Sequence, residues 1–132
     1  MKGETQGVTE VRFMNTSDLR AKVRVAVNSL LSKKGYVSPV DVLLEMDRLE
    51  PKAYENWRFG RVPYLEKVCV GNLSKLTTIM KELKRYAQEQ GLRESRTDYR
   101  KWGKGKKIQL RFSKSGKQSI EEAYSTHYLK KQ

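Results

Sequence analysis

The chain has 132 residues, of which 37% are hydrophobic and 33% are charged, and its formal net charge at pH 7 is +13. This length suits one domain with a hydrophobic core, and the composition is too apolar for a disordered chain. No apolar run follows Met1 and no segment approaches the about 20 apolar residues that cross a bilayer, so we expect a cytoplasmic protein without a signal peptide or membrane partner.

The N-terminal part of the chain predicts an arm and one helix. Residues 1–16 show no clear apolar periodicity and are expected to form a flexible arm. From Ser17 or Asp18 to Lys34, apolar residues recur on one helical face, and Gly35 follows as a stop signal. A single domain is expected to begin with this helix and to include the rest of the chain.

A capping pattern predicts the second helix. Ser38 can accept a hydrogen bond at the helix start, Pro39 suits the first helical position, and Asp41 completes a spacing similar to a capping box. Pro51 is expected to mark the far end of this helix, because proline disrupts a helix interior.

Residues 50–62 are expected to form an aromatic connector, followed by a short helix at about 63–70. Two interpretations of Arg58 and Arg61 are open. In the first, they contact nucleic acid from a mobile loop. In the second, which is favoured, their stems lie above an apolar surface, because long cationic side chains often cover such surfaces. The aromatic residues of the connector are Tyr54, Trp57 and Phe59.

A long helix is predicted between Asn72, which can cap it, and Gly91, which can end it. Its apolar residues follow one stripe, and its outward side carries cations and hydroxyl groups with few acids. An exposed helix also carries such residues for solvation alone, so both interpretations are open. The residues expected to face nucleic acid here are Ser74, Lys75, Thr78, Lys81, Lys84 and Arg85.

Two strands, at about 93–102 and 107–112, are expected to form a β-hairpin. The second strand alternates apolar and polar residues, which predicts that Ile108, Leu110 and Phe112 point inward. The tip between the strands contains two glycines, which tolerate the positive φ of a sharp turn.

This hairpin is the most cationic segment of the chain. Each Lys or Arg brought to a phosphate releases condensed counterions, so a projecting cationic hairpin suits a polyanion. Trp102 can stack on a base or pack on the inner face of the hairpin, and both interpretations are open. The hairpin residues expected to contact nucleic acid are Arg100, Lys101, Trp102, Lys104, Lys106, Lys107 and Arg111.

A last helix is expected over about 117–130, with Tyr124, His127 and Tyr128 on one face. The two tyrosines are expected to pack on the body of the protein, and a homodimer formed through this helix is the alternative. A single histidine on a helix favours a packing role over a catalytic one.

The sequence shows no sign of catalysis. Cys69 is the only cysteine, which excludes an internal disulfide and a cysteine-rich zinc site. No phosphate-binding glycine loop, dinucleotide fingerprint or metal-ligand spacing is found. We therefore expect a non-enzymatic protein without a metal or cofactor.

Helices followed by a basic hairpin resemble the winged-helix group of helix-turn-helix proteins, over about residues 17–112. The resemblance implies that residues 73–90 enter a major groove and that residues 102–107 reach the neighbouring backbone or minor groove. The connector departs from this pattern, since the family has a tight turn there; alternatively, a helix at 63–70 and the turn after it supply the helix-turn-helix. The expected fold class is α+β, mainly α with a two-stranded β-hairpin: a winged-helix-like domain with about five helices and a basic wing.

Two segments, WRFGRVPYLE at 57–66 and LRFSKSG at 110–116, are similar to segments of uncharacterised bacterial proteins, which indicates a bacterial or phage-type source. This resemblance implies no activity.

The positive charge is concentrated in one half of the chain: the net charge is +4 over residues 1–34, −1 over 35–70 and +10 over 71–132. A basic half of this kind is typical of nucleic-acid-binding proteins. The leading hypothesis is duplex DNA binding in a regulatory or accessory role, with DNA more favoured than RNA. The alternatives are an RNA- or ribosome-binding module, and a phage or mobile-element protein that binds a protein partner through residues 35–70.

Overall fold

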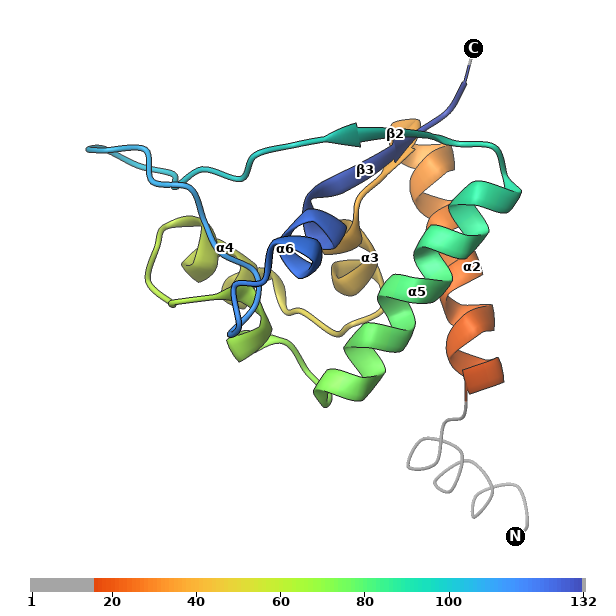
Figure 1. Ribbon diagram of the computed structural model, residues 1–132, viewed down its shortest axis with the longest axis horizontal. Coiled ribbons are helices and arrows are strands. Elements are labelled where there is room, and N and C mark those ends of the chain that lie inside the picture. Colours follow the sequence, from red (N-terminus) through yellow and green to blue (C-terminus); the bar gives the residue numbers. More distant parts are fainter. Residues whose placement is uncertain (1–15, 132) are drawn as a thin grey trace, which may run out of the picture.

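The computed structural model describes residues 16–131, so the predicted arm lies outside the described residues except for Thr16, which begins the first described helix (Figure 1). Helices predominate, and a small antiparallel sheet completes an α+β fold. The elements in chain order are α2 (Thr16–Lys34), β1 (Tyr36–Val37), α3 (Pro39–Glu45), α4 (Pro51–Arg58), the 3-10 helix η1 (Leu65–Val68), α5 (Leu73–Glu89), β2 (Arg93–Arg96), α6 (Gln118–Ser125) and β3 (Thr126–Leu129).

The two long helices form as the sequence predicts, and they pack against each other at one end of the molecule (Figure 1). The Asn72 side chain accepts a hydrogen bond from the backbone N–H of Lys75 at 2.9 Å, which caps α5. Gly91 follows α5 with φ of 68°, a conformation that favours glycine. Leu76, Ile79, Leu83 and Ala87 of α5 are buried in the core.

The predicted start of α3 is confirmed, but its predicted end is wrong. Ser38 Oγ accepts the backbone N–H of Asp41 at 3.0 Å, and Pro39 is the first helical residue. The helix then ends at Glu45, and the chain turns through Asp47 with φ of 58°. Pro51 does not end this helix but begins α4, because proline fits the first turn, where its missing N–H has no helical partner.

Most of the predicted connector at 50–62 is therefore the helix α4. The short helix predicted at 63–70 is a single 3-10 turn at η1. Trp57 of α4 is wholly buried, and its indole N–H donates to the Arg111 carbonyl at 2.8 Å. This contact joins α4 to the segment that leads toward α6.

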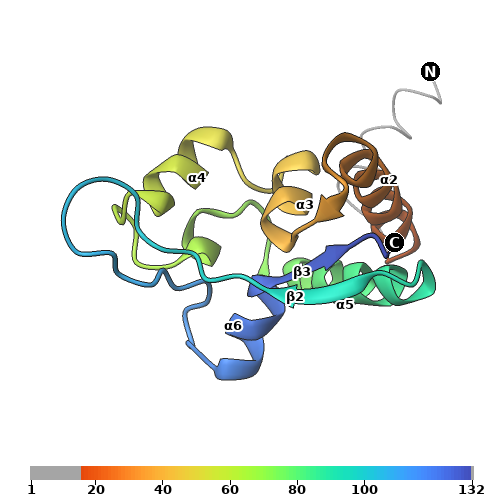
Figure 2. The ribbon, with the colours of Figure 1, turned by 90° about the horizontal axis from the view of Figure 1, so that it is seen from above.

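The sheet differs from the predicted hairpin. Its strand order is β1-β3-β2, with β3 antiparallel to both neighbours (Figure 2). The predicted strand at 93–102 is limited to β2, and its partner is β3 rather than residues 107–112. Only one isolated bridge, Arg100 with Gln109, joins the two predicted hairpin strands within the described residues. The predicted helix at 117–130 ends at Ser125, where the chain enters β3.

Residues 107–112 do not join the sheet. The Lys101 N–H donates to the Ile108 carbonyl at 2.8 Å and the Leu110 N–H to the Tyr99 carbonyl at 2.7 Å, whereas residues 111–112 lie against η1. The backbone N–H groups of Leu65 and Glu66 donate to the carbonyls of Arg111 and Phe112 at 3.1 and 2.9 Å. Leu110 and Phe112 are buried as predicted, whereas Ile108 is 56% exposed. Among residues 16–131, no helix combines the length and apolar character that a membrane crossing requires.

Candidate nucleic-acid interface

The segment between β2 and α6 carries a strong excess of positive charge. From Tyr99 to Lys117 the sequence contains eight cationic and no acidic side chains. Figures 1 and 2 show that its first part, which we call the cationic loop (residues 100–107), projects at the end of the molecule opposite α2 and α5. Arg100 pairs with Asp98 at 3.6 Å. Within residues 16–131, no carboxylate lies at ion-pair distance from the other loop cations, Lys101, Lys104, Lys106 and Lys107.

The cationic loop is anchored to the end of α4. The backbone N–H of Trp102 donates to the Arg58 carbonyl at 2.7 Å. The Trp102 ring makes edge contacts with Tyr54 and Phe59, with centroid distances of 5.8 and 5.6 Å. Gly103, with φ of 95°, lies so close that an added Cβ would be 3.4 Å from the Phe59 ring. Trp102 therefore packs on the body, yet it remains 38% exposed.

Arg58 is a site residue that the sequence analysis did not select. Its guanidinium carbon lies 5.0 Å from the Tyr99 ring centroid and 4.7 Å from that of Trp102. Its Nε is buried without a hydrogen-bond partner, and no carboxylate among the described residues pairs with it. The only sequence signal is an arginine among aromatic residues, because Tyr99 and Trp102 are some 40 residues away along the chain.

Two predicted contact residues also hold the local backbone. The Arg111 Nε donates to the Ser113 carbonyl at 2.7 Å, and its terminal nitrogen donates to the Lys114 carbonyl. Lys107 Nζ donates to the Gly103 carbonyl inside the cationic loop. Arg111 therefore stabilises the turn before α6. The side chains of Lys104 and Lys106 in the cationic loop are exposed to solvent.

The α5 residues predicted to face nucleic acid fall into two groups, of which only the first lines a groove beside α6. Lys81 and Lys84 are exposed and line a groove of about 260 Å³ between α5 and α6, with Thr77 and Met80 beside them. The opposite wall of this groove includes Ile120 of α6. These two lysines remain the best candidates on α5 for contact with an anion.

The other predicted residues of α5 face α2 or the helix start. Arg85 pairs with Glu82 at 3.8 Å and Glu89 at 3.5 Å, and these acids also pair with Arg20 and Arg24 of α2. The charge of Arg85 is therefore locally balanced. At the helix start, Ser74 is exposed and accepts the Thr78 hydroxyl through its carbonyl, and Lys75 is half-buried.

The structure does not bring the predicted helix surface and the cationic loop together. Along the long axis of the molecule, α6 lies between them in both views (Figures 1 and 2). No protein-family model, curated protein or solved structure matches this chain. The winged-helix resemblance and the likeness to bacterial proteins stay predictions.

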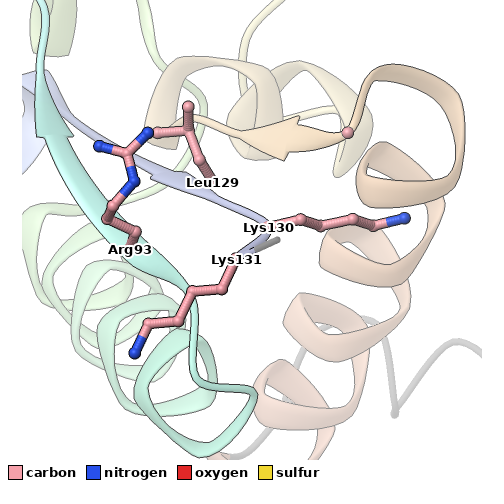
Figure 3. A pocket seen from close by; sticks show the side chains of 5 residues that line it. Arg93, Leu129, Lys130 and Lys131 are labelled. Atoms are coloured by element: carbon pink, nitrogen blue, oxygen red, sulfur yellow. The ribbon is translucent and has the colours of Figure 1, made fainter.

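A second basic cluster lies where β2 and β3 meet the end of α2. The pairing of Arg93 with Leu129 places Arg93 near Lys130 and Lys131, around a hollow of about 740 Å³. Figure 3 shows the three cationic side chains extending in different directions, so their charges do not converge on one point. No local sequence pattern predicts this cluster, because it depends on pairing between distant segments.

The described residues contain no group of three His, Cys, Asp or Glu side chains that could hold a metal ion. Burial raises the pKa of the Cys69 thiol to about 12, and this thiol donates to the Leu65 carbonyl at 3.4 Å. Cys69 is therefore protonated at neutral pH and is a poor nucleophile.

His127 and its neighbours have packing roles. Its ring stacks on Tyr36 with a centroid distance of 5.8 Å, and its Nε2 shares a hydrogen bond of 2.9 Å with the Tyr99 hydroxyl. Tyr124 and Tyr128 are buried within the chain, as predicted. These two tyrosines therefore offer no free surface for a homodimer.

His127 should make the stability of the protein depend on pH. Burial lowers its pKa below the ordinary value, so the unfolded chain binds a proton more readily than the folded chain. The free energy of unfolding should fall as the pH decreases from 7 to 5. Urea denaturation at both pH values checks this, and His127→Gln should show a smaller loss; an equal loss in both proteins would contradict it.

Proposed function

We propose that the protein binds duplex DNA as a non-catalytic regulatory or accessory protein, with the cationic loop on the phosphate backbone and the exposed side of α5 toward a groove. The observation that carries this proposal is the acid-free run of eight cations between Tyr99 and Lys117, of which the loop part is held outward by α4. Such a surface gains affinity from counterion release without a reaction centre.

The order of elements supports a winged-helix-like arrangement. The helices α2, α3 and α5 precede β2, the cationic loop follows β2, and the chain returns to the sheet as β3. This is the helix-then-wing order that the resemblance implies, with α4 and η1 inserted before the long helix. In this proposal α5 presents Lys81 and Lys84 to one stretch of the duplex, and the loop, which lies beyond α6 along the long axis of the molecule, contacts a separate stretch as an enlarged wing.

Replacing Lys104, Lys106 and Lys107 together with alanine should weaken duplex binding at least about tenfold at low salt. If all three contact phosphates, the slope of log affinity against log salt concentration should become less steep by about 2.7, since each lost contact contributes about 0.9. Fluorescence anisotropy with a labelled duplex at several salt concentrations measures both quantities.

The matched control replaces Lys22, Lys33 and Lys52, which removes the same charge from other parts of the surface. Its affinity should fall less and its salt slope should change by less than about 1. Equal effects of the two triple variants would show that only net charge matters, and would remove the cationic loop from the interface.

RNA is the second candidate ligand, favoured by one observation. Trp102 is partly exposed beside unpaired cations, and single-stranded RNA is commonly bound by stacking of its bases on aromatic side chains. Competition of the labelled duplex with structured RNA at equal salt ranks the two candidates.

A further inference from the structure

We infer that Arg58 and Trp102 form a site for an unpaired nucleotide of a single-stranded nucleic acid, with the phosphate on Arg58 and the base against Trp102. The inference rests on the proposed function in one respect, that the cationic loop faces nucleic acid. It adds a distinct site at the end of α4, which takes a single strand rather than a duplex.

The Arg58 guanidinium is held in place before any ligand arrives. Its carbon lies 4.7, 5.0 and 6.0 Å from the ring centroids of Trp102, Tyr99 and Trp57. Rings at these distances attract the cation and restrict its rotamers. The backbone carbonyl of the same residue accepts the Trp102 N–H at 2.7 Å, so the cationic loop and Arg58 are fixed relative to each other.

The donors of this guanidinium are not used within the described part of the chain. Among the described residues the Arg58 guanidinium donates no hydrogen bond and pairs with no carboxylate, and its Nε is buried without a partner. Arginine has five N–H donors in a planar fork that fits phosphate. A buried structural arginine normally has an acidic partner, so an oriented guanidinium without one indicates an external anion.

Lys101 supplies a second cation at the same end of α4. Its side chain lies over Gly60, where an added Cβ would be 3.2 Å from Lys101 Cε. Lys104 and Lys106 follow in the cationic loop and are exposed. A single-stranded nucleic acid with one phosphate on Arg58 therefore meets further cations along the cationic loop.

The exposed ring of Trp102 favours an unpaired nucleotide over one in a duplex. The ring is oriented by Tyr54 and Phe59 and is 38% exposed beside Arg58. Bases in a duplex stack on each other and do not present their faces to a side chain, whereas an unpaired base does. A cation and an exposed aromatic ring side by side match the phosphate and the base of one nucleotide.

Tryptophan fluorescence tests the site in the full chain. The protein has two tryptophans, and Trp57 is wholly buried, so a stacked base quenches Trp102 alone. We expect an oligo(dT) 15-mer to quench the emission and a blunt duplex of equal length to leave it nearly unchanged. Trp102→Phe should abolish the quenching but keep most of the oligo(dT) affinity measured by anisotropy, because phenylalanine still stacks, whereas Trp102→Leu should bind about tenfold more weakly.

Arg58→Lys keeps the charge but loses the planar fork and should weaken oligo(dT) binding about tenfold. The matched control is Arg61→Lys, since Arg61 also lies over an aromatic ring, Phe59, but is exposed and bonded to Asn56; it should bind within twofold of the wild type. Urea denaturation establishes that both variants fold.

The outcomes separate this inference from the proposed function. Duplex binding without quenching by oligo(dT) overturns the single-strand site and leaves the proposed function standing. Wild-type binding by a folded Arg58→Lys variant also overturns the site. If neither oligonucleotide binds at low salt, both proposals are wrong.

Discussion

Trp57→Phe should lower the free energy of unfolding by about 3 kcal/mol, because it removes a buried hydrogen bond and part of a buried ring system. The Trp57 indole N–H donates to the Arg111 carbonyl at 2.8 Å, and its ring contacts Phe112 and Tyr99 at centroid distances of 5.2 and 5.6 Å. Phenylalanine removes one of the two donors to this carbonyl, which keeps only the Leu65 N–H at 3.1 Å. Urea denaturation followed by circular dichroism measures the change.

The same variant should loosen the segment that follows the cationic loop, because Trp57 joins α4 to residues 111–112 through its hydrogen bond to Arg111 and its ring contact with Phe112. Limited proteolysis should cut the variant faster in this region than the wild type. Trp102→Phe is the control, since that tryptophan is partly exposed and its indole donates no hydrogen bond within the described structure. An unchanged urea midpoint for Trp57→Phe would show that the indole hydrogen bond contributes nothing to stability.

Local signals in the sequence were sufficient for the helices with a clear period and a cap. The start of α3 follows from Ser38 and Pro39, and the limits of α5 follow from Asn72 and Gly91. In each case, a side-chain hydrogen bond or a backbone conformation within a few residues decides the boundary. Such interactions are local, so the sequence alone reveals them.

Pro51 was interpreted wrongly because proline has two meanings near a helix. After a helical pattern it predicts the end of α3, whereas it occupies the first position of α4. The turn at Asp47, a non-glycine residue with positive φ, ends α3 four residues earlier and carries no strong sequence signal. Tyr54 and Trp57 of the predicted connector therefore lie on a helix, and Phe59 is its C-cap.

The strand β3 could not be distinguished from a helix by spacing. Tyr124 and Tyr128 are four residues apart, which places them on one face of a helix and equally on one face of a strand. Within β3, Thr126 and Tyr128 are buried and His127 is partly exposed, which is the period of two. What selects the strand is pairing with β1 and β2, from residues 36–37 and 93–96, and such distant pairing is not visible in a local pattern.

The candidate site was predicted in its charge but not in its architecture. The cations of the loop are evident from composition. The placing of the Arg58 guanidinium beside the Tyr99 and Trp102 rings is not evident from the sequence, because it requires α4 to lie against residues 99–102. On α5 the reverse holds: the cations were identified, but Arg85 is neutralised by Glu82 and Glu89, of which Glu82 is mostly buried.

Glu121→Ala should lower the free energy of unfolding by about 3 kcal/mol, because it leaves several buried donors without an acceptor. The Glu121 carboxylate accepts the backbone N–H groups of Phe112 and Ser113 at 2.9 and 2.8 Å and the Ser113 hydroxyl at 2.5 Å. Ser113 is only 1% exposed, so water cannot replace these bonds without local opening. Glu121→Gln should also destabilise, since one carboxylate oxygen becomes an amide NH₂ that faces N–H or O–H donors.

The neighbouring Glu122 gives a matched control on the same helix. Its carboxylate is exposed to solvent and bonds to Arg96 and Gln118 at the surface, so Glu122→Ala should have little effect on the urea midpoint. If Glu121→Ala were as mild as Glu122→Ala, the three hydrogen bonds would not hold residues 112–113 against α6. A large loss in the free energy of unfolding for Glu121→Ala alone, together with weaker duplex binding, would show that α6 positions residues 112–113 through the Glu121 carboxylate.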